Sequence, residues 1–394
     1  MWQKYWPSFL KVYPYKYQNK FGVINEERIK EVQKLLSCGI FSKGFILYEC
    51  SDCGIRLAVP FSCKSRLCLS CYRKKIFGWS LNFSSILNKS MKHYHVVFTF
   101  PGQLTNILFN RGFKPQILNR IAANIYMKEQ WLSKSLLNKN WKPGIMSTVH
   151  IAGNGLNYNP HVHMVATKDM VHKDTGEIKE VNYINFKAFR FAWQKAVCDY
   201  LVKKNIISNE EKEIFLNQYK NGFHVYFKNI DGENNDILFR TAEYLGTNIL
   251  HNSQIENVDY RKNLVTFNFK SWVDRTTKEK RHKKVTMNVF EFMARMLYFL
   301  PDKHEKTIRY YGIYSKPASS LKRRKIQNHQ CSWANGITHL FEKNPAKCPA
   351  CNKEMGMVII FSFHARKIEK VLKQKYHLIG GYFYPFEMKC LRPP

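Results

Sequence analysis

The stretch Asn159-Pro-His-Val-His-Met-Val-Ala166 decides how the rest of the sequence is interpreted. In an extended chain alternate side chains share a face, so His161 and His163 would point one way while the residues between and after them enter a core. The preceding segment 145–152 also has the composition of a strand, and turn-forming residues fill the connection. The sequence therefore predicts a β-hairpin whose second strand carries two imidazoles, which together can hold one divalent cation.

The His-x-His spacing alone does not establish a metal site. A chain of 394 residues with 14 histidines contains about 0.5 such pairs by chance, which is the usual weakness of a short motif. A second pair, His93 and His95, lies on the strand-like segment 93–100. Histidines often occupy half-buried positions without a metal, so the alternative is that both pairs simply line a strand face.

The charge balance indicates a polyanionic partner. The chain has 63 Lys and Arg against 29 Asp and Glu, which gives a net charge of +34. Such a surplus repels itself unless anions compensate it, and 22 Tyr, 28 Phe and 8 Trp are available to stack on unpaired bases. An AT-rich genome would explain the abundance of lysine but not the shortage of acidic residues. We therefore expect DNA or RNA as the partner.

The sequence predicts a cytoplasmic protein. It has no run of about 18 apolar residues, so we expect no membrane span. The segment 1–7 lacks the apolar core of a signal peptide. Cysteines in the cytoplasm stay reduced, so clustered ones are expected to bind metal or fill a core rather than to form disulfides.

Five cysteines between positions 50 and 71 predict an N-terminal zinc module. Two Cys-x2-Cys knuckles match the tetrahedral zinc pattern, and we assign the ligands to Cys50, Cys53, Cys68 and Cys71. This choice leaves Cys38 and Cys63 without a role. Basic residues surround the knuckles, so the module is expected to contact DNA; the candidates are Arg66, Arg73 and Lys74.

A second informative segment is the predicted helix 238–251. Spacings of four, four and three place Arg240, Tyr244, Asn248 and His251 on one polar face. A tyrosine with an arginine one turn before it and an amide one turn after it is well placed to meet a phosphate. The alternative is that Tyr244 is an ordinary surface residue of an amphipathic helix.

Three regions are expected. Residues 1–85 form the zinc-binding DNA-recognition domain, residues 86–315 form a catalytic domain, and residues 316–394 contain a basic linker and a small C-terminal region. The last region holds Cys348 and Cys351, a knuckle without an obvious partner pair, which is either half of a second zinc site or a structural turn. Four residues could complete it: His329, Cys331, His339 and Cys390.

Taken together, these segments resemble the rolling-circle transposases of the insertion-sequence ninety-one type. These enzymes belong to the HUH superfamily of single-strand endonucleases, named for a His-hydrophobe-His motif. The resemblance also favours His161 and His163 over the earlier pair, which falls in the first strand motif. The matching segments follow the family order: 61–71 (zinc knuckle), 95–102 (first strand motif), 160–163 (metal motif), 244–246 (nucleophile helix), 308–312 (end of the catalytic domain) and 333–351 (C-terminal end).

The resemblance implies an α+β fold with a central antiparallel sheet and flanking helices. It also implies that Tyr244 attacks single-stranded DNA beside a Mg²⁺ or Mn²⁺ ion, producing a 5′-phosphotyrosine and a free 3′-hydroxyl. Because imidazoles alone suit Mn²⁺ better than Mg²⁺, an oxygen ligand is expected to complete the metal site. Asn248 is the nearest candidate, with Glu243 and His251 as weaker ones.

The sequence departs from the family in one place. Members of the two-tyrosine kind carry a second tyrosine four residues after the first, where this chain has Asn248. Either Tyr244 is used twice, a second subunit of a homodimer supplies the other nucleophile, or the element is defective. The expected DNA partners are single-stranded or hairpin element ends and a target strand. Two alternatives stay open: a replication initiator or relaxase with the same chemistry, and a non-catalytic zinc-dependent DNA-binding protein.

Overall fold

The chain forms two compact units. The computed structural model describes residues 1–87, 91–128, 140–172, 174–181, 184–230, 241, 245–246, 249–250, 254–273, 279–302, 304–315, 344 and 347–361. One unit comprises residues 1–78 together with 330–394, and the other comprises residues 79–329. Among the helices of the described ranges, none has the length and apolarity needed to cross a bilayer.

The larger unit is built on a five-stranded antiparallel sheet with the strand order β13-β5-β6-β3-β9. Its central strands are β5 (Gly144–Ala152) and β6 (Tyr158–Thr167), which form the predicted hairpin. The other three are β3 (His93–Phe98), β9 (Val225–Ile230) and β13 (Ile308–Gly312). The predicted strands that carry the histidine pairs are therefore confirmed.

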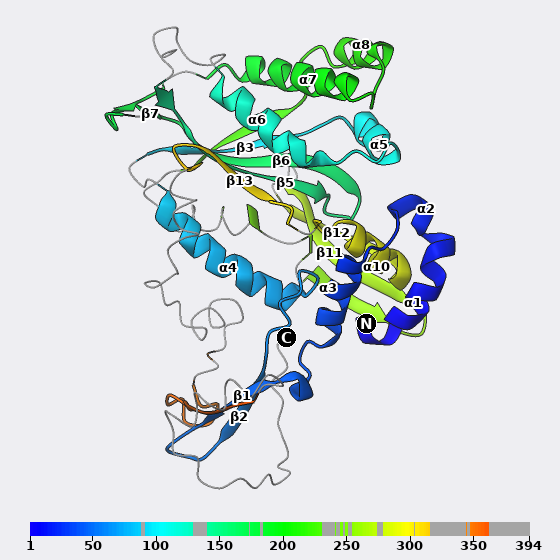
Figure 1. Ribbon diagram of the computed structural model, residues 1–394, viewed down its shortest axis with the longest axis vertical. Coiled ribbons are helices and arrows are strands. Elements are labelled where there is room, and N and C mark those ends of the chain that lie inside the picture. Colours follow the sequence, from blue (N-terminus) through cyan, green and yellow to red (C-terminus); the bar gives the residue numbers. More distant parts are fainter. Residues whose placement is uncertain are drawn as a thin grey trace. The chain divides into compact units, whose positions relative to one another are not determined.

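The two faces of this sheet have different partners. Val162 and Met164 are fully buried in the main core, as their alternation predicts, together with residues of the helices that cover this face. These helices are α5 (Gly102–Asn110), α6 (Leu118–Met127), α7 (Phe186–Lys203) and α8 (Asn209–Gln218). Figure 1 shows α6 and α7 on the same side of the sheet. The opposite face carries the histidines and a smaller core that includes Phe83, Val165 and Leu245.

Further strands extend the larger unit. A second antiparallel sheet contains β10 (Ile255–Asp259), β11 (Leu264–Val273) and β12 (Lys280–Asn288). It leads into α10 (Val289–Tyr298), whose first turn is capped by the Asn288 side chain. The remaining elements are η2 (Pro115–Ile117), β4 (Trp141–Lys142), β7 (Met170–His172) and β8 (Ile178–Lys179).

The smaller unit combines helices with a three-stranded antiparallel sheet of order β14-β1-β2. Its strands are β1 (Phe45–Glu49), β2 (Arg56–Pro60) and β14 (Gly356–Phe361). Its helices are α1 (Trp2–Lys16), α2 (Gln18–Phe21), α3 (Glu26–Leu36) and η1 (Phe41–Lys43). The Asn25 side chain caps α3, because it accepts a hydrogen bond from the Arg28 N–H.

The compact units divide the chain at other places than the expected domain limits. The unit boundary follows Gly78, inside α4 (Leu69–Ile86), because Phe83 and Leu87 pack in the core of the larger unit. The segment around Cys348 does not stand apart as a third region, since β14 pairs with β1. The fold is mixed α and β with antiparallel sheets, as expected, whereas its identity as an HUH fold remains a prediction.

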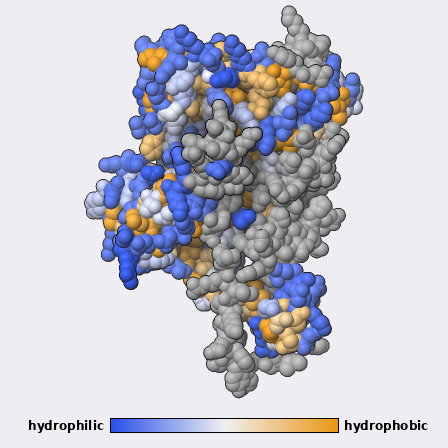
Figure 2. Space-filling model, turned by 180° about the vertical axis from the view of Figure 1, so that it is seen from behind, coloured by the Kyte–Doolittle hydropathy of each residue, from blue (hydrophilic) through white to orange (hydrophobic). Residues whose placement is uncertain are grey.

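The described surface is rich in hydrophilic residues. Figure 2 shows them over much of the visible described surface, with hydrophobic residues in separate areas between them. This distribution agrees with the large excess of Lys and Arg in the sequence. Charged side chains remain hydrated at the surface because burial without a partner costs free energy.

Two glycines with similar backbone conformations, Gly312 at the end of β13 and Gly112, differ in how closely other backbone atoms approach them. Gly312 has a φ of +59°, and a Cβ at this position would lie 1.8 Å from the Pro143 carbonyl oxygen, which also accepts the Ile313 N–H at 3.1 Å. Gly112 has a similar φ of +64° with no atom within 4 Å of a Cβ. Gly112→Ala should cost about 1–2 kcal/mol, the penalty of the left-handed conformation alone.

We therefore predict that Gly312→Ala lowers the free energy of unfolding of the larger unit by roughly 1–3 kcal/mol more than Gly112→Ala, because backbone must move. Denaturant unfolding of both variants measures the difference. Equal losses would contradict the described contact between β13 and Pro143.

Candidate active site and metal centres

Four histidines from three neighbouring strands cluster on the second face of the five-stranded sheet, which also carries His93 beside Tyr314. His150 of β5 stands directly opposite His161 of β6, and His163 is paired with Val97 of β3 on its other side. His95 also belongs to this face, since its neighbours Tyr94 and Val96 point into the main core. The strand alternation therefore brings together side chains that are far apart in the sequence.

Three of these histidines are close enough to bind one metal ion. One ring nitrogen from each of His150, His161 and His163 lies within 4.8 Å of the others. The ring centroids of His163 are 4.5 Å from His150 and 4.7 Å from His161. Metal–imidazole bonds of about 2.0–2.1 Å place ligand nitrogens roughly 3–4 Å apart, so small side-chain rotations suffice for a shared ion.

Hydrogen bonds orient two of the three rings. The Nδ1 atom of His161 lies 2.7 Å from the Asn159 carbonyl oxygen, so this nitrogen donates its proton and Nε2 keeps a lone pair. The Nε2 atom of His150 lies 3.2 Å from the Leu245 carbonyl oxygen and donates to it, which leaves Nδ1 as the ligand atom. Backbone carbonyls commonly fix metal-binding histidines in this way.

His95 contacts the third ring. Its Nε2 atom lies 3.0 Å from Nδ1 of His163, and the two rings are stacked with centroids 5.2 Å apart. If Nδ1 of His163 donates this hydrogen bond, His163 keeps the lone pair of Nε2 for a metal. His95 then acts as the acceptor that selects this tautomer.

The rings are neutral at physiological pH. Burial lowers the pKa of His95 and of His150 to about 4, assisted by Lys228 and by His161 respectively. Burial also lowers the pKa of His163 well below its usual value, and the other three histidines add to this effect. The pKa of His161 is lowered by burial, against the raising effect of the Asn159 carbonyl. Neutral imidazoles are the form that binds metals.

The predicted nucleophile segment lies mostly outside the described residues. This applies to Arg240, Tyr244 and Asn248, and also to the weaker ligand candidates Glu243 and His251. Leu245, the residue after Tyr244, is described. Its side chain is buried in the same small core as Val165, and its carbonyl accepts the His150 hydrogen bond. The chain therefore reaches the histidine cluster at that point.

His150 is the site residue that sequence reasoning missed. An oxygen ligand was expected beside His161 and His163, whereas the described chain supplies a third imidazole. The strand 145–152 was predicted, but its register was not, and an irregularity between His150 and Ala152 obscures it. One feature of the sequence could have predicted it: His150 lies in the first strand of the predicted hairpin, opposite the strand that carries His161 and His163.

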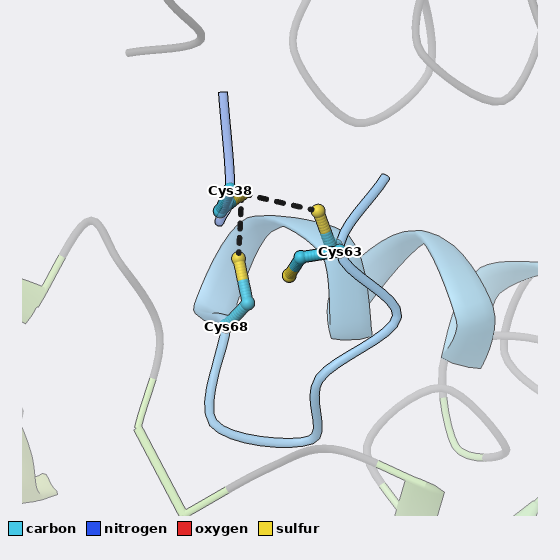
Figure 3. A group of neighbouring side chains, drawn as sticks. Cys38, Cys63 and Cys68 are labelled. Carbon is cyan, nitrogen blue, oxygen red and sulfur yellow. Dashed lines mark hydrogen bonds between the residues drawn. The ribbon is translucent and has the colours of Figure 1, made fainter. Parts of the chain in front are cut away.

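The predicted grouping of Cys50, Cys53, Cys68 and Cys71 into one site is wrong. Cys68 and Cys71 instead form a cluster with the two cysteines left without a role, Cys38 and Cys63. The sulfur of Cys38 lies 3.7 Å from those of Cys68 and Cys71. Figure 3 shows the sulfurs of Cys38, Cys63 and Cys68 directed toward one another. Four Zn–S bonds of about 2.3 Å separate the sulfurs by about 3.8 Å, so the cluster fits zinc.

Glu31 joins the segments that supply these cysteines. Its backbone carbonyl accepts from the Ser65 hydroxyl at 2.8 Å, and its carboxylate accepts the Arg66 N–H at 2.7 Å. Burial raises the pKa of Glu31, but hydrogen bonds from Lys34 and the Arg66 N–H outweigh it and lower the pKa overall. The carboxylate therefore stays charged and ties α3 to the loop before Cys68.

Cys50 and Cys53 belong to a second cluster, with Cys348 and Cys351. The predicted second knuckle at Cys348 thus has a partner pair, although it was expected elsewhere. The four candidates His329, Cys331, His339 and Cys390 lie outside the described residues. A simple count was the missed signal. The two N-terminal knuckles need two further cysteines each, and Cys38 with Cys63 and the C-terminal knuckle supply them.

The basic residues predicted to contact DNA flank the first cluster in the sequence. Arg66 precedes Cys68 by two residues, and Arg73 and Lys74 follow Cys71 on α4. All three side chains are half-buried rather than fully exposed. Their role in DNA binding stays a prediction.

Comparisons with known proteins match both units. Residues 3–100 match the family described as "Transposase zinc-binding domain" of the IS91 type. Residues 144–322 match the family described as "Putative transposase". The chain is 23% identical over 309 residues to the transposase for insertion sequence element IS801 from Pseudomonas savastanoi pv. phaseolicola, covering 74% of this chain and 71% of that protein. No solved structure matches the chain.

We predict that His150 is needed for metal binding. His150→Ala should weaken Mn²⁺ binding at least as much as loss of an outer-shell partner, about 10–100-fold, because one of three imidazole ligands is removed. His224→Ala is the control, since this histidine is exposed and lies outside the cluster. Isothermal titration of both variants measures the effect. Unchanged affinity in His150→Ala would remove this residue from the metal site.

Proposed function

Because the chain belongs to the transposases of the insertion-sequence ninety-one (IS91) type, we propose that it nicks and rejoins single-stranded DNA with Tyr244 as the nucleophile. The proposal rests chiefly on one contact, the hydrogen bond from His150 to the carbonyl of Leu245. Leu245 follows Tyr244 directly in the sequence. Because Leu245 contacts a proposed metal ligand, this contact supports the proposal that its sequence neighbour Tyr244 is the nucleophile.

His150, His161 and His163 are proposed as the metal ligands of this site. A divalent ion bound there would polarise the scissile phosphate and compensate the charge that develops on its oxygens. Three imidazoles favour Mn²⁺ over Mg²⁺, which prefers oxygen ligands. We propose His150 as the third ligand, the role predicted for Asn248. With three imidazoles as ligands, the ion would not need an oxygen ligand from the predicted helix 238–251.

The proposed reaction conserves the number of phosphodiester bonds. The Tyr244 oxygen forms a bond to phosphorus while the bond from phosphorus to the 3′ oxygen breaks. The phenol loses a proton and the departing 3′ oxygen gains one, so the products are a 5′-phosphotyrosine and a 3′-hydroxyl. Attack of a 3′-hydroxyl on the phosphotyrosine reverses the step and joins a strand. No nucleotide cofactor is needed, because the covalent intermediate retains the bond energy.

A single tyrosine suffices for this cycle if it is used twice. The position four residues after Tyr244 carries Asn248, which cannot serve as a second nucleophile. Release of the first phosphotyrosine by strand joining regenerates the free phenol of Tyr244. The other route is a homodimer, in which each subunit contributes one tyrosine.

DNA is the proposed partner of both units. The net charge of +34 would drive binding through the release of counterions from phosphates. Arg66, Arg73 and Lys74 beside the first cysteine cluster, and Arg240 on the nucleophile segment, are proposed to contact the backbone of the DNA. We assign recognition of the element ends to the zinc-binding unit and strand cleavage to the larger unit.

We predict that Tyr244→Phe abolishes covalent attachment to labelled single-stranded oligonucleotides in Mn²⁺, because phenylalanine lacks the attacking oxygen. Tyr260→Phe is the matched control; its side chain is 46% exposed in the turn after β10 and should leave the adduct unchanged. Denaturing gels detect the adduct as a labelled protein band.

Two outcomes would contradict this function. An adduct that persists in Tyr244→Phe would exclude this tyrosine as the nucleophile. Absence of an adduct from the parent protein across many oligonucleotide sequences, with DNA binding intact, would favour a non-catalytic zinc-dependent binding protein. A replication initiator or relaxase would form the same adduct, so recombination between two element ends is the assay that distinguishes a transposase.

His95 is proposed as a positioning residue that acts through His163. His95→Leu removes the acceptor of the Nδ1–H of His163 and should weaken Mn²⁺ binding about 10–100-fold, the usual cost of losing an outer-shell partner of a metal ligand. His95→Gln retains an acceptor and should recover part of the affinity. Saturating Mn²⁺ should restore adduct formation in His95→Leu. Failure of saturating metal to restore it would indicate a direct role in catalysis instead.

A further inference from the structure

The second cysteine cluster brings together two segments that lie far apart in the sequence. Cys50 and Cys53 follow β1, whereas Cys348 and Cys351 precede β14. The sulfur of Cys53 lies 3.4 Å from that of Cys348, a residue 295 positions later. The sulfur of Cys351 lies 3.4 Å from Cys50 and 3.8 Å from Cys53.

These sulfur distances fit a shared metal better than disulfides. A disulfide requires about 2.05 Å between sulfurs, and all four cysteines are free thiols. Tetrahedral coordination of zinc by four thiolates requires about 3.8 Å. The first cluster, with distances of 3.7 Å, provides the internal comparison.

The two loops have the same backbone structure although they lie far apart in the sequence. In the first, the Cys50 N–H donates to the Ile55 carbonyl at 2.9 Å and the Gly54 N–H donates to the Cys50 carbonyl at 2.9 Å. In the second, the N–H groups of Cys348 and Asn352 make the corresponding bonds at 2.8 and 2.9 Å. Gly54 and Asn352 both have positive φ, at 67° and 58°.

Backbone N–H groups also point at the sulfurs in the same pattern. Cys50 accepts from Asp52 and Cys53, two and three residues onward, and Cys348 accepts from Ala350 and Cys351 at the same offsets. Cys53 and Cys351 each accept from the residue two positions later. Hydrogen bonds of this kind stabilise thiolates, the form in which cysteine binds a metal.

Among the described residues, the core around the cluster is small. Its buried members are Cys50, Leu57, Cys348 and Met355, with Tyr48, Ile55 and Val59 packed against them. An ion pair between Lys353 and Asp52 links the loops at the surface, but exposed pairs contribute little. Small units with such cores usually depend on a metal.

We infer that Cys50, Cys53, Cys348 and Cys351 bind one structural Zn²⁺ ion that ties the C-terminal part of the chain to the N-terminal zinc-binding unit. Thiolates select zinc among the common divalent ions, and four of them close its coordination sphere. Strand β14 then completes the sheet beside β1. The unit assigned to DNA recognition is thus assembled only when residues 348–361 are present. This inference does not depend on Tyr244 or on the histidine site.

The test is zinc stoichiometry in the full-length protein, measured by mass spectrometry of the metal. Cys50→Ser/Cys53→Ser and Cys348→Ser/Cys351→Ser should each lose one equivalent relative to the parent. The quadruple variant should also lose only one, because both pairs serve the same ion. Cys198→Ala, at a buried cysteine outside both clusters, should lose none.

Loss of two equivalents in the quadruple variant, or unchanged zinc in Cys348→Ser/Cys351→Ser, would overturn the inference.

A second measurement, alkylation of the cysteines, needs no variant. Cys53 and Cys351 are exposed, so without metal they should react quickly with an alkylating reagent. In the parent protein we expect all four cysteines to be protected and to become reactive together when a chelator removes zinc. Rapid alkylation of Cys53 and Cys351 before chelation would equally refute the shared ion.

Discussion

The pairing of β5 with β6 is the constraint on which the candidate active site depends. Because side chains alternate along a strand, this register places His150 and His161 on the face that also carries His163 and His95. The same alternation buries Val162 and Met164 in the main core. A slip of one residue would exchange the two sets, burying imidazoles in an apolar core. The apolar core therefore fixes the candidate metal site, because its packing energy holds the register that brings the histidines together.

The sequence predicted those parts of the site that depend on local patterns. Alternation around His161 and the turn-forming residues before it predicted the hairpin of β5 and β6. It could not predict His150 as a third imidazole, since an irregular register between strands is set by tertiary packing. Nor could it supply the contacts of His95, because β3 pairs with β6 across 68 positions of sequence. Such long-range pairings leave no periodicity in the chain.

The cysteines illustrate the opposite difficulty, in which a local pattern is strong and misleading. Two Cys-x2-Cys knuckles close together in sequence suggest one site, yet each knuckle combines with cysteines from elsewhere. The reason is geometric: β1 and β2 form a hairpin, so Cys50 and Cys53 lie in its turn, whereas Cys63 and Cys68 follow the hairpin's other end. A strand pair of five residues separates the two knuckles, too far for one ion to span.

The two kinds of site are suited to different tasks by the charge of their ligands. Four thiolates bring four negative charges to a dication and close its coordination sphere, so a site of this type holds the fold together and offers nothing to a phosphate. The three imidazoles are neutral, as the lowered pKa values of His150 and His163 indicate. They would leave the full charge of the ion, and at least one open coordination position, available to an anionic substrate. Within the described residues no carboxylate joins the histidine cluster to reduce that charge. This difference in ligand charge is the physical reason for assigning phosphate chemistry to the five-stranded sheet and a structural role to the cysteine clusters.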